Sequence, residues 1–303
     1  MIVVKLIGGL GNQMFQYAYG LQLAKQYNEH ICFDTSFYAA DKPLALYNLN
    51  VPVYPEWNKC AIAKSERVGV VLSQKVYHVL QKMIRVLGRT DRTGTLLYKK
   101  CAKYGLIYNF DPYYYDIPQT DAANKYIYGY FQGEAYFVDC IEQLRNAFTI
   151  KHALSAQAKG YLQQISNTNA VALHIRLGDY KNVKNKDLDV CSIAYYQRAI
   201  KYIAEHLGEH RLFVFTNEVE KITQILELSE NTVIISGTKD YEDYMLMQQC
   251  KHFILSNSTF SWWAAYLAQN ADKIIVVPEK WRHSEEDEPA IYTSQMIKLP
   301  IEN

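Results

Sequence analysis

The second half of this sequence alternates short apolar runs with stretches of helical character, and this pattern limits the possible folds more than any other feature. The apolar runs stand at 171–175, 212–215, 233–235, 253–255 and 274–277, and the helical stretches lie near 193–206, 219–228, 240–250 and 260–268. Strands that alternate with helices build a doubly wound parallel sheet, and such sheets bind ligands beyond the carboxyl ends of their strands. We therefore expect five parallel strands, with the chemistry at their ends.

The first half opens in the same way and then becomes irregular. An apolar run at 2–7, helical spacing over 14–24 and a second apolar run at 31–33 predict a β-α-β unit. Residues 42–150 contain scattered prolines and aromatic clusters, and we expect mixed helices and loops there. The simplest α/β architecture is two Rossmann-like domains facing each other across a cleft, an N-terminal one at 1–150 and a C-terminal one at 151–303.

Composition excludes several classes of protein. Of the 303 residues, 49% are hydrophobic and 21% are charged, as in an ordinary globular chain. The 32 Lys and Arg against 31 Asp and Glu give a net charge of +1, so no global positive field attracts nucleic acid. We therefore expect no nucleic-acid partner.

The six cysteines are widely spaced and form neither a C-x-x-C pair nor a zinc-like set with histidines. The N-terminus lacks the basic segment of a signal peptide, and no apolar run reaches the length of a membrane span. These features predict a cytoplasmic protein with reduced thiols, no bound metal and no cofactor.

Residues 64–103 form a basic stretch inside this neutral chain, with ten Lys and Arg against two acidic residues. A helix would carry part of this charge as one stripe, because the residues step by three and four: Lys75, His78, Lys82, Arg85 and Arg89. One interpretation is a peripheral contact with anionic lipid at the inner face of a membrane or with a lipid-linked acceptor. The other is a solvated face of a helix that packs on the core.

The first candidate site is the glycine-rich turn GGLGNQM at 8–14, between a predicted strand and a predicted helix. Glycines let the backbone approach a ligand at a helix N-terminus. Met14 replaces the third glycine of a dinucleotide-binding fingerprint, whereas Asp34 lies about 20 residues downstream, where a ribose-binding acid would stand. On this segment alone, a nucleotide-dependent oxidoreductase competes with a simple tight turn.

The second candidate is HIRLGDY at 174–180, which leaves the first strand of the C-terminal half. An isolated buried charge is costly, so Arg176 needs a partner. That partner is either Asp179, in an internal ion pair, or a phosphate held in the cleft by the planar guanidinium.

The third candidate is LSNSTFSWW at 255–263, where a strand runs into hydroxyl residues and then a helix. Ser and Thr at such a junction cap helices in many proteins. Hydroxyl and N–H groups at the positive end of a helix dipole also make a seat for a diphosphate. Together with 174–180, this segment places an arginine and an anion-binding helix start on one edge of one sheet.

These segments together resemble the bacterial α-1,2-fucosyltransferases of glycosyltransferase family 11. The resemblance rests on GGLGNQMFQYA at the start, GYFQGEAYF at 129–137, HIRLGDY at 174–180, FTNE at 215–218 and LMQQCKHFILSNSTFSWWAAYL at 246–267. It implies a glycosyltransferase-B fold, GDP-β-L-fucose as donor and inversion at the anomeric carbon without a required metal. It also implies an acceptor, the 2-hydroxyl of a terminal galactose in an oligosaccharide or a lipid-linked O-antigen unit.

The resemblance implies roles for individual residues. Arg176 takes the place of the arginine that grips the β-phosphate of the donor, and Leu177 stands where the family pattern has a second arginine. The expected donor-binding residues are Arg176, Asn217, Glu218, Asn257, Ser258, Thr259, Phe260 and Ser261. The expected acceptor-side residues are Gly11, Asn12 and Gln13, and the expected catalytic residues are Arg176, Asp179, His174, Asn12 and Glu134.

Two of these residues, Asp179 and Glu134, are candidates for a carboxylate base that takes the proton of the acceptor hydroxyl. The D-x-D at 187–189 imitates the motif of metal-dependent glycosyltransferases, and we interpret it as an exposed turn. A nucleotide-dependent oxidoreductase and a non-catalytic glycan-binding module built on the 26 tyrosines are the alternatives.

Overall fold

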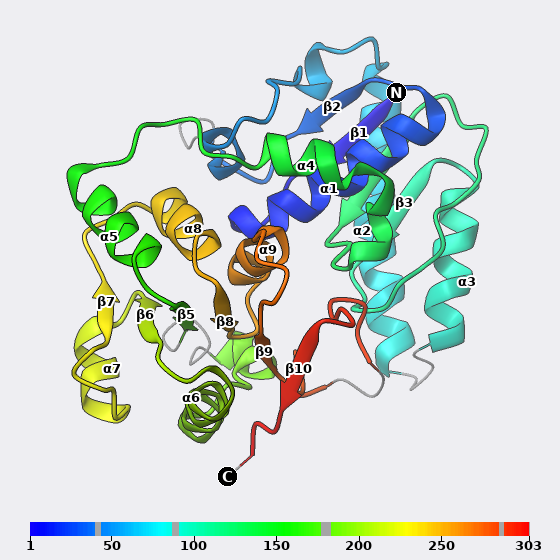
Figure 1. The fold of residues 1–303 in the computed structure, drawn as a ribbon. Coiled ribbons are helices and arrows are strands. Elements are labelled where there is room, and N and C mark those ends of the chain that lie inside the picture. Colours follow the sequence, from blue (N-terminus) through cyan, green and yellow to red (C-terminus); the bar gives the residue numbers. More distant parts are fainter. Residues whose placement is uncertain (40–43, 87–90, 177–182, 285–287, 303) are drawn as a thin grey trace. The chain divides into compact units, whose positions relative to one another are not determined.

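The structure is a computed structural model that describes residues 1–39, 44–86, 91–176, 183–284 and 288–302 (Figure 1). The chain divides into two compact units, Met1–Phe148 and Thr149–Asn303. Each unit is built on a parallel sheet of its own, which confirms the prediction of an α/β chain with two Rossmann-like parts.

The first unit has a four-stranded sheet in the order β2-β1-β4-β3. Its strands are β1 (Ile2–Lys5), β2 (Ile31–Asp34), β3 (Leu106–Asn109) and β4 (Lys125–Gly129). Its helices are α1 (Leu10–Tyr27), α2 (Lys64–Val86), α3 (Asp91–Ala102) and α4 (Ile141–Ala147), with 3-10 turns η1 (Ala45–Asn48), η2 (Trp57–Lys59), η3 (Glu134–Tyr136) and η4 (Val138–Cys140). The expected β-α-β start is present as β1, α1 and β2.

Two layers of helix cover this sheet, because successive side chains of β1 point to opposite faces. Val3 belongs to the apolar cluster that Val70 and Tyr77 of α2 complete. Val4 points to α1, where a Cβ on Gly20 would come within 2.5 Å of its Cγ2 atom. Glycine at position 20 therefore lets α1 lie close against the strand.

The expectation of mixed helices and loops over 42–150 missed the strands β3 and β4. Strand β4 is hard to find because it begins with Lys125, a charged residue that is only 2% exposed. Its ammonium lies 2.7 Å from Glu29 Oε1 and 4.2 Å from the centre of the Tyr27 ring. This long-range ion pair allows a strand to begin with a buried charge.

The second unit has a six-stranded sheet in the order β10-β9-β8-β5-β6-β7. Its strands are β5 (Ala170–Ile175), β6 (Arg211–Thr216), β7 (Val233–Ile235), β8 (His252–Ile254), β9 (Ile275–Pro278) and β10 (Met296–Leu299). Five of these are the expected strands, and β10 is a sixth that the apolar pattern did not reveal. The order is that of a Rossmann sheet, in which the chain reverses direction between the first and the fourth strand.

Helices cover both faces of this sheet. Helices α5 (Ala156–Ser166), α8 (Asp240–Gln248) and α9 (Thr259–Leu267) lie on one face, and α6 (Ile193–Leu207) and α7 (Val219–Ile225) lie on the other (Figure 1). Alternate residues of β5, Val171, Leu173 and Ile175, pack with Tyr195 and Ile203 of α6. The 3-10 segment η6 (Val183–Leu188) precedes α6.

Within the described residues, no helix is both long and apolar enough to cross a bilayer. All six cysteines are free thiols, as expected. Among the same residues, no group of three or more His, Cys, Asp and Glu side chains is placed to hold a metal ion.

Candidate functional site

Each sheet has one point where the chain reverses the direction in which it adds strands. In the second unit β6 and β7 extend one side of β5, while β8, β9 and β10 extend the other. In the first unit the corresponding point lies between β1 and β4. The connections after the two central strands diverge there, which leaves room for a ligand at the carboxyl ends. We call residues 174–176 and 255–261 the β5–β8 edge, and residues 6–13 and 129–134 the β1–β4 edge.

His174 joins the two sides of the β5–β8 edge. Its Nδ1 atom lies 2.9 Å from Ser261 Oγ and 2.9 Å from Ser256 Oγ. The pairing of β5 with β8, Leu173 opposite Ile254, fixes this register. The sequence motifs at 174–180 and 255–263 are therefore physically connected, and Ser256 is a member of the site that the sequence analysis did not single out.

The hydrogen bonds around His174 connect it to the start of α9. The Ser261 hydroxyl that contacts Nδ1 also donates to the Ser258 carbonyl at 3.2 Å. Burial, together with the positive charge of Arg176, lowers the pKa of His174 to about 3. The ring is neutral at physiological pH and acts as a fixed hydrogen-bonding group.

Ser258 is the N-cap residue of α9, but its side chain does not cap the helix. The hydroxyl oxygen is buried and has no hydrogen-bond partner in the described part of the chain. A buried polar group without a partner costs free energy, so native structures rarely keep one without a functional reason. Ser258 therefore does not cap the helix through its side chain, although its residue type suggests that it would. Its hydroxyl lies at the positive end of the α9 dipole.

The Asn257 side chain, in contrast, makes hydrogen bonds within the protein. Its Nδ2 atom donates to the carbonyl of Leu188 at 2.8 Å and to the carbonyl of Trp281 at 3.0 Å. The side chain therefore ties the segment before α6 and the segment after β9 to the strand end. Phe260 lies further along the edge, with its ring 6.0 Å from the His174 ring.

Arg176 directly follows β5, so its backbone leaves the sheet at the β5–β8 edge. Two other members of the motif, Leu177 and Asp179, lie outside the described residues. Asn217 and Glu218 follow β6, the neighbouring strand, and Asn217 is exposed. The Glu218 carboxylate pairs with Lys221 at 2.8 Å.

The first aspartate of the D-x-D at 187–189 makes hydrogen bonds within the chain. Asp187 accepts from the Ser284 backbone N–H at 2.8 Å and from the Ser284 hydroxyl at 2.9 Å. The Asp187 carbonyl accepts from the backbone N–H of His283. The Asp187 carboxylate thus ties η6 to the segment before residue 285, whereas the interpretation as an exposed turn describes Asp189, which is exposed.

The β1–β4 edge is built on a tight turn in which glycine is required. Gly8 has φ +78°, and a Cβ there would lie 2.6 Å from the side-chain nitrogen of Asn12. Gln132, which follows β4, donates to Asn12 Oδ1 at 2.9 Å. Two segments that the resemblance singled out, 8–14 and 129–137, thus meet at this edge.

Gln13 and Gln16 fill the space beneath this turn. Gln13 is 1% exposed and donates to the Gly8 carbonyl at 3.1 Å, while its oxygen accepts from the Leu46 N–H at 2.9 Å. Gln16 accepts from the Ile7 N–H at 2.9 Å and donates to the Gly129 carbonyl at 3.0 Å, which links the ends of β1 and β4. The sequence analysis missed Gln16, although it lies one helical turn after Gln13.

Glu134 begins η3 and is partly exposed. Within the described residues, its carboxylate makes no hydrogen bond and no ion pair with another side chain. Asp34, the expected ribose-binding acid of the oxidoreductase alternative, is 1% exposed and lies 3.2 Å from Lys5 Nζ. Its carboxylate is therefore used inside the protein.

Residues 108–299 match the model of glycosyl transferase family 11. The chain belongs to this family. The matched range covers the end of the first unit and nearly all of the second, including the β5–β8 edge and the segment from β4 to Glu134.

Several relatives of this family 11 chain are named after their reactions. An alpha-1,2-colitosyltransferase of Escherichia coli is 28% identical over 295 residues, which cover 94% of each chain. The O-antigen biosynthesis glycosyltransferase WbnK of Escherichia coli is 29% identical and covers 91% of this chain and 93% of WbnK. Galactoside alpha-(1,2)-fucosyltransferase 1 of Sus scrofa is 31% identical over 146 residues, covering 44% of this chain and 40% of the pig enzyme.

Solved structures share the fold of this family 11 member. The crystal structure of fucosyltransferase NodZ from Bradyrhizobium superposes with a TM-score of 0.55, covering 88% of this chain and 92% of that chain, at 14% sequence identity. At this identity the likeness concerns the fold alone. It agrees with the expected glycosyltransferase-B type.

Proposed function

We propose that the chain transfers L-fucose from GDP-β-L-fucose to the 2-hydroxyl of a terminal galactose, with inversion, to give an α-1,2 linkage. The acceptor would be an oligosaccharide or a lipid-linked O-antigen unit. The names of the relatives support this proposal, because they describe an α-1,2-fucosyltransferase, an α-1,2-colitosyltransferase and an O-antigen glycosyltransferase.

The observation that carries the proposal is the unpartnered Ser258 hydroxyl at the start of α9, on the same edge as Arg176. A guanidinium and a helix start with a spare hydroxyl bind a diphosphate through charge, dipole and hydrogen bonds together. This edge lies at the reversal point of a Rossmann sheet, where nucleotides bind in such folds.

The reaction breaks the bond between the anomeric carbon and the phosphate oxygen and forms a bond from that carbon to the acceptor oxygen. Negative charge grows on the departing GDP, and Arg176 and Ser258 are assigned to stabilise it. His174, neutral and held by Ser256 and Ser261, keeps the two sides of this edge together.

The acceptor hydroxyl loses its proton to a carboxylate. Glu134 is suited to this role because its carboxylate is partly exposed and not committed to another described group. Asp179 is the other candidate. The Asp187 carboxylate is already satisfied by Ser284, so we assign it no metal and propose a metal-independent reaction.

A second donor has support of its own. The colitosyltransferase relative spans 94% of this chain, so a colitose nucleotide is a candidate beside GDP-fucose. The two sugars differ at one ring hydroxyl, and a site that hydrogen-bonds that hydroxyl would reject colitose strongly.

The experiment that tests the proposal is incubation with labelled GDP-fucose and a panel of lactose, N-acetyllactosamine and Gal-β-1,3-GalNAc. Label should appear in at least one product that is sensitive to an α-1,2-specific fucosidase. A parallel reaction with GDP-colitose separates the two donors, and one with EDTA tests metal independence. Binding of GDP-fucose without transfer or hydrolysis would favour a non-catalytic module, and binding of NADH instead would favour an oxidoreductase.

A further inference from the structure

Helix α2 presents a continuous row of exposed apolar side chains. Val68, Leu72, Val79 and Met83 are 61%, 60%, 59% and 55% exposed, and Val76 and Leu80 lie in the same row. On the opposite side of the helix, Val70, Gln74 and Tyr77 are buried against the first unit. The helix is therefore apolar on the side that faces away from its own sheet.

This row is larger than the scattered apolar residues that any surface carries. Residues 68, 72, 76, 79, 80 and 83 follow helical spacing and form one stripe along a helix of 23 residues. A contiguous exposed apolar patch on a soluble domain marks a surface that contacts a partner or a membrane.

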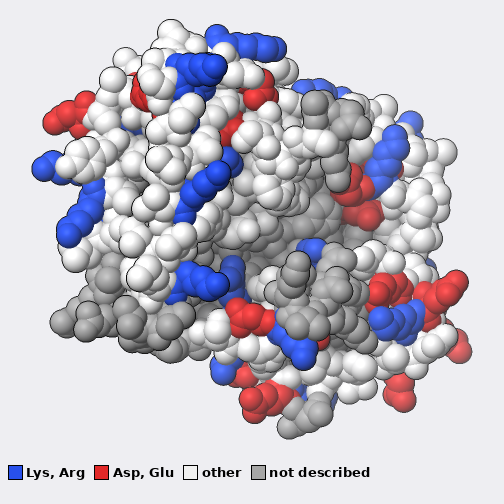
Figure 2. All heavy atoms as spheres, turned by 180° about the vertical axis from the view of Figure 1, so that it is seen from behind, with Lys and Arg blue, Asp and Glu red and all other residues white. Residues whose placement is uncertain are grey.

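Basic side chains border the row. Lys64, Lys75 and Lys82 lie along one side of it on α2 and are exposed. Helix α3, which lies beside α2, adds exposed lysines at its end, Lys99 and Lys100, followed by Lys103. Figure 2 shows Lys and Arg side chains spread over otherwise uncharged surface on the side that carries these helices.

Glu66, the acidic residue of α2, is bonded to other groups of the first unit. Glu66 accepts hydrogen bonds from Tyr126 at 2.7 Å and from Asn124 at 2.9 Å, both of the segment around β4. The sequence from 64 to 103 has ten Lys and Arg against two acidic residues, an excess of +8. The partner of this surface must therefore be both apolar and anionic.

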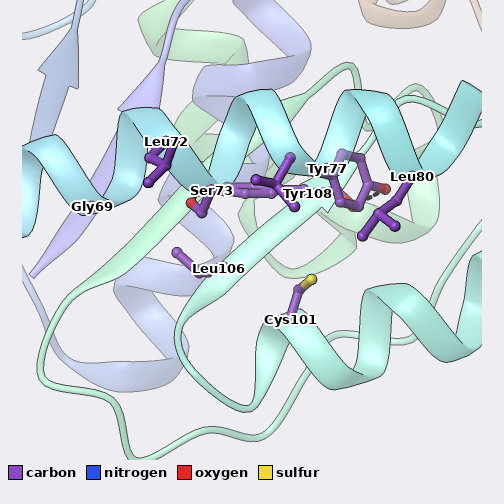
Figure 3. Close-up of a pocket in the computed structure, with 9 residues that line it drawn as sticks. Gly69, Leu72, Ser73, Tyr77, Leu80, Cys101, Leu106 and Tyr108 are labelled. Atoms are coloured by element: carbon purple, nitrogen blue, oxygen red, sulfur yellow. Dashed lines mark hydrogen bonds between the residues drawn. The ribbon is translucent and has the colours of Figure 1, made fainter.

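A groove of about 320 Å³ opens beside the row, between α2 and α3. Its walls are almost entirely apolar and include Leu72, Val76 and Leu80 from the row itself and Leu106 at its floor (Figure 3). A groove that is continuous with an apolar helix face offers a place for acyl chains that rise from the interface of a bilayer.

We propose that α2 and α3 form a docking surface for an anionic phospholipid bilayer, with α2 lying flat in the interface. The lysines contact lipid phosphates while the row enters the boundary of the acyl region. The helix does not cross the membrane, in keeping with the charged residues along its length. This inference goes beyond the proposed reaction and does not depend on it.

The test is sedimentation of the full-length chain with sucrose-loaded vesicles. We expect binding to vesicles with 30% phosphatidylglycerol in phosphatidylcholine, and little binding to phosphatidylcholine alone. Raising the salt from about 0.1 to 0.5 M should release most of the protein, because lysine contacts are screened while the apolar contribution persists. Absence of binding to anionic vesicles at low salt, or equal binding to neutral ones, would overturn the proposal.

Variants separate the two contributions. Lys75→Gln with Lys82→Gln should weaken binding roughly 25-fold, since each lysine near an anionic surface contributes about fivefold, which equals about 1 kcal/mol. Leu72→Gln with Val79→Gln should weaken binding by at least tenfold and leave the salt dependence in place.

Matched controls are available in the same chain. Val53→Gln replaces a side chain that is 78% exposed in the first unit, and Lys159→Gln replaces an exposed lysine on α5. Both should bind vesicles like the unchanged protein. Circular dichroism melting shows that each variant is folded, and sedimentation velocity tests for a dimer. A dimer that Leu72→Gln dissociates would mean that a second copy covers the row, and would overturn the lipid assignment.

Discussion

The β5–β8 edge and the β1–β4 edge have the same topology and opposite chemistry. At the β5–β8 edge a cation, Arg176, and an unsatisfied buried hydroxyl, Ser258, follow the strands. At the β1–β4 edge neutral amides predominate, as in the bond from Gln132 to Asn12, and Gln16 beneath the edge bonds to Gly129. The charged group of this edge is the Glu134 carboxylate.

This difference shows what each edge can bind. An edge with a charge and a missing hydrogen bond suits an anion that supplies the missing partner. An edge of satisfied amides suits a neutral, hydroxyl-rich molecule that adds to an existing network. Under the proposed function these are the diphosphate donor and the sugar acceptor.

Replacing Arg176 is the most direct test of diphosphate binding at the β5–β8 edge. Arg176→Ala should lower kcat at least a hundredfold, because losing one preorganised group that stabilises the leaving diphosphate costs on the order of 3 to 4 kcal/mol. Initial rates at saturating donor and acceptor measure the effect. Arg198→Ala, which removes a partly exposed guanidinium bonded to the Pro300 carbonyl, is the control. Near-normal turnover of Arg176→Ala would contradict the assignment.

Replacing Glu134 tests whether the β1–β4 edge supplies the carboxylate that takes the proton of the acceptor hydroxyl. Glu134→Gln should lower kcat about a hundredfold with little change in the affinity for GDP, since the base acts on the acceptor. Single-turnover rates and calorimetric titration with GDP give the two quantities. If Asp179→Asn loses activity and Glu134→Gln does not, the base belongs to the segment after β5.

Two neighbouring glycines, Gly8 and Gly9, provide a matched pair that tests the backbone geometry of the turn at the β1–β4 edge. Gly8→Ala should destabilise the fold by about 1 to 3 kcal/mol, because φ is +78° and the new Cβ would displace Asn12. Gly9→Ala should be tolerated, since its φ is −82° and nothing lies within 4 Å of a new Cβ. Urea unfolding followed by fluorescence compares them. Equal destabilisation by both changes would show that the turn geometry is not the cause.

Comparing variants of Ser258 and Ser261 distinguishes a hydroxyl that binds the ligand from a hydroxyl that stabilises the fold. Ser258→Ala should bind GDP roughly tenfold more weakly and be as stable as the original chain or more so, because its hydroxyl makes no hydrogen bond to the described residues. Ser261→Ala removes a bond to His174 and should cost about 1 kcal/mol of stability. Calorimetry and thermal unfolding give both values. A large loss of stability in Ser258→Ala would indicate a structural role.

A further comparison is the pH dependence of stability that His174 produces. Its pKa is about 3 in the folded chain and 6.5 as an ordinary histidine, so between these values the unfolded chain binds the extra proton. Stability therefore falls as the pH drops from 6.5 towards 3. His174→Asn should lose less stability than the original chain between pH 7 and pH 4, by thermal unfolding. Parallel curves for the two proteins would mean that His174 does not titrate as described.

Local patterns in the sequence were enough to predict five of the six strands of the second unit and its helices α6, α7, α8 and α9, but not α5. Apolar runs ended at the strand ends, and polar motifs followed them, so the location of 174–176 and 255–261 on one edge was predictable. Strand β10 was not, because its four residues include the charged Lys298 and follow an irregular segment. Strand β4 begins with Lys125, whose partner Glu29 is almost a hundred residues away.

The details of the site depend on contacts that no local rule contains. The residue type of Ser258 predicts a helix cap, and only the fold shows that its hydroxyl is unused. The bond between Ser256 and His174 joins residues that are 82 positions apart. The role of Gln16 could not be predicted from its position in a helix, because it depends on the ends of β1 and β4 that its amide contacts.

The Gln16 amide has a consequence for how a sugar approaches the first unit. Because it bonds to backbone groups at the tips of both β1 and β4, the gap between these strands is closed by the protein itself. Under the proposed function, an acceptor sugar contacts the surface that these strand ends form and does not enter between them. Discrimination between acceptors then depends on the side chains around that surface.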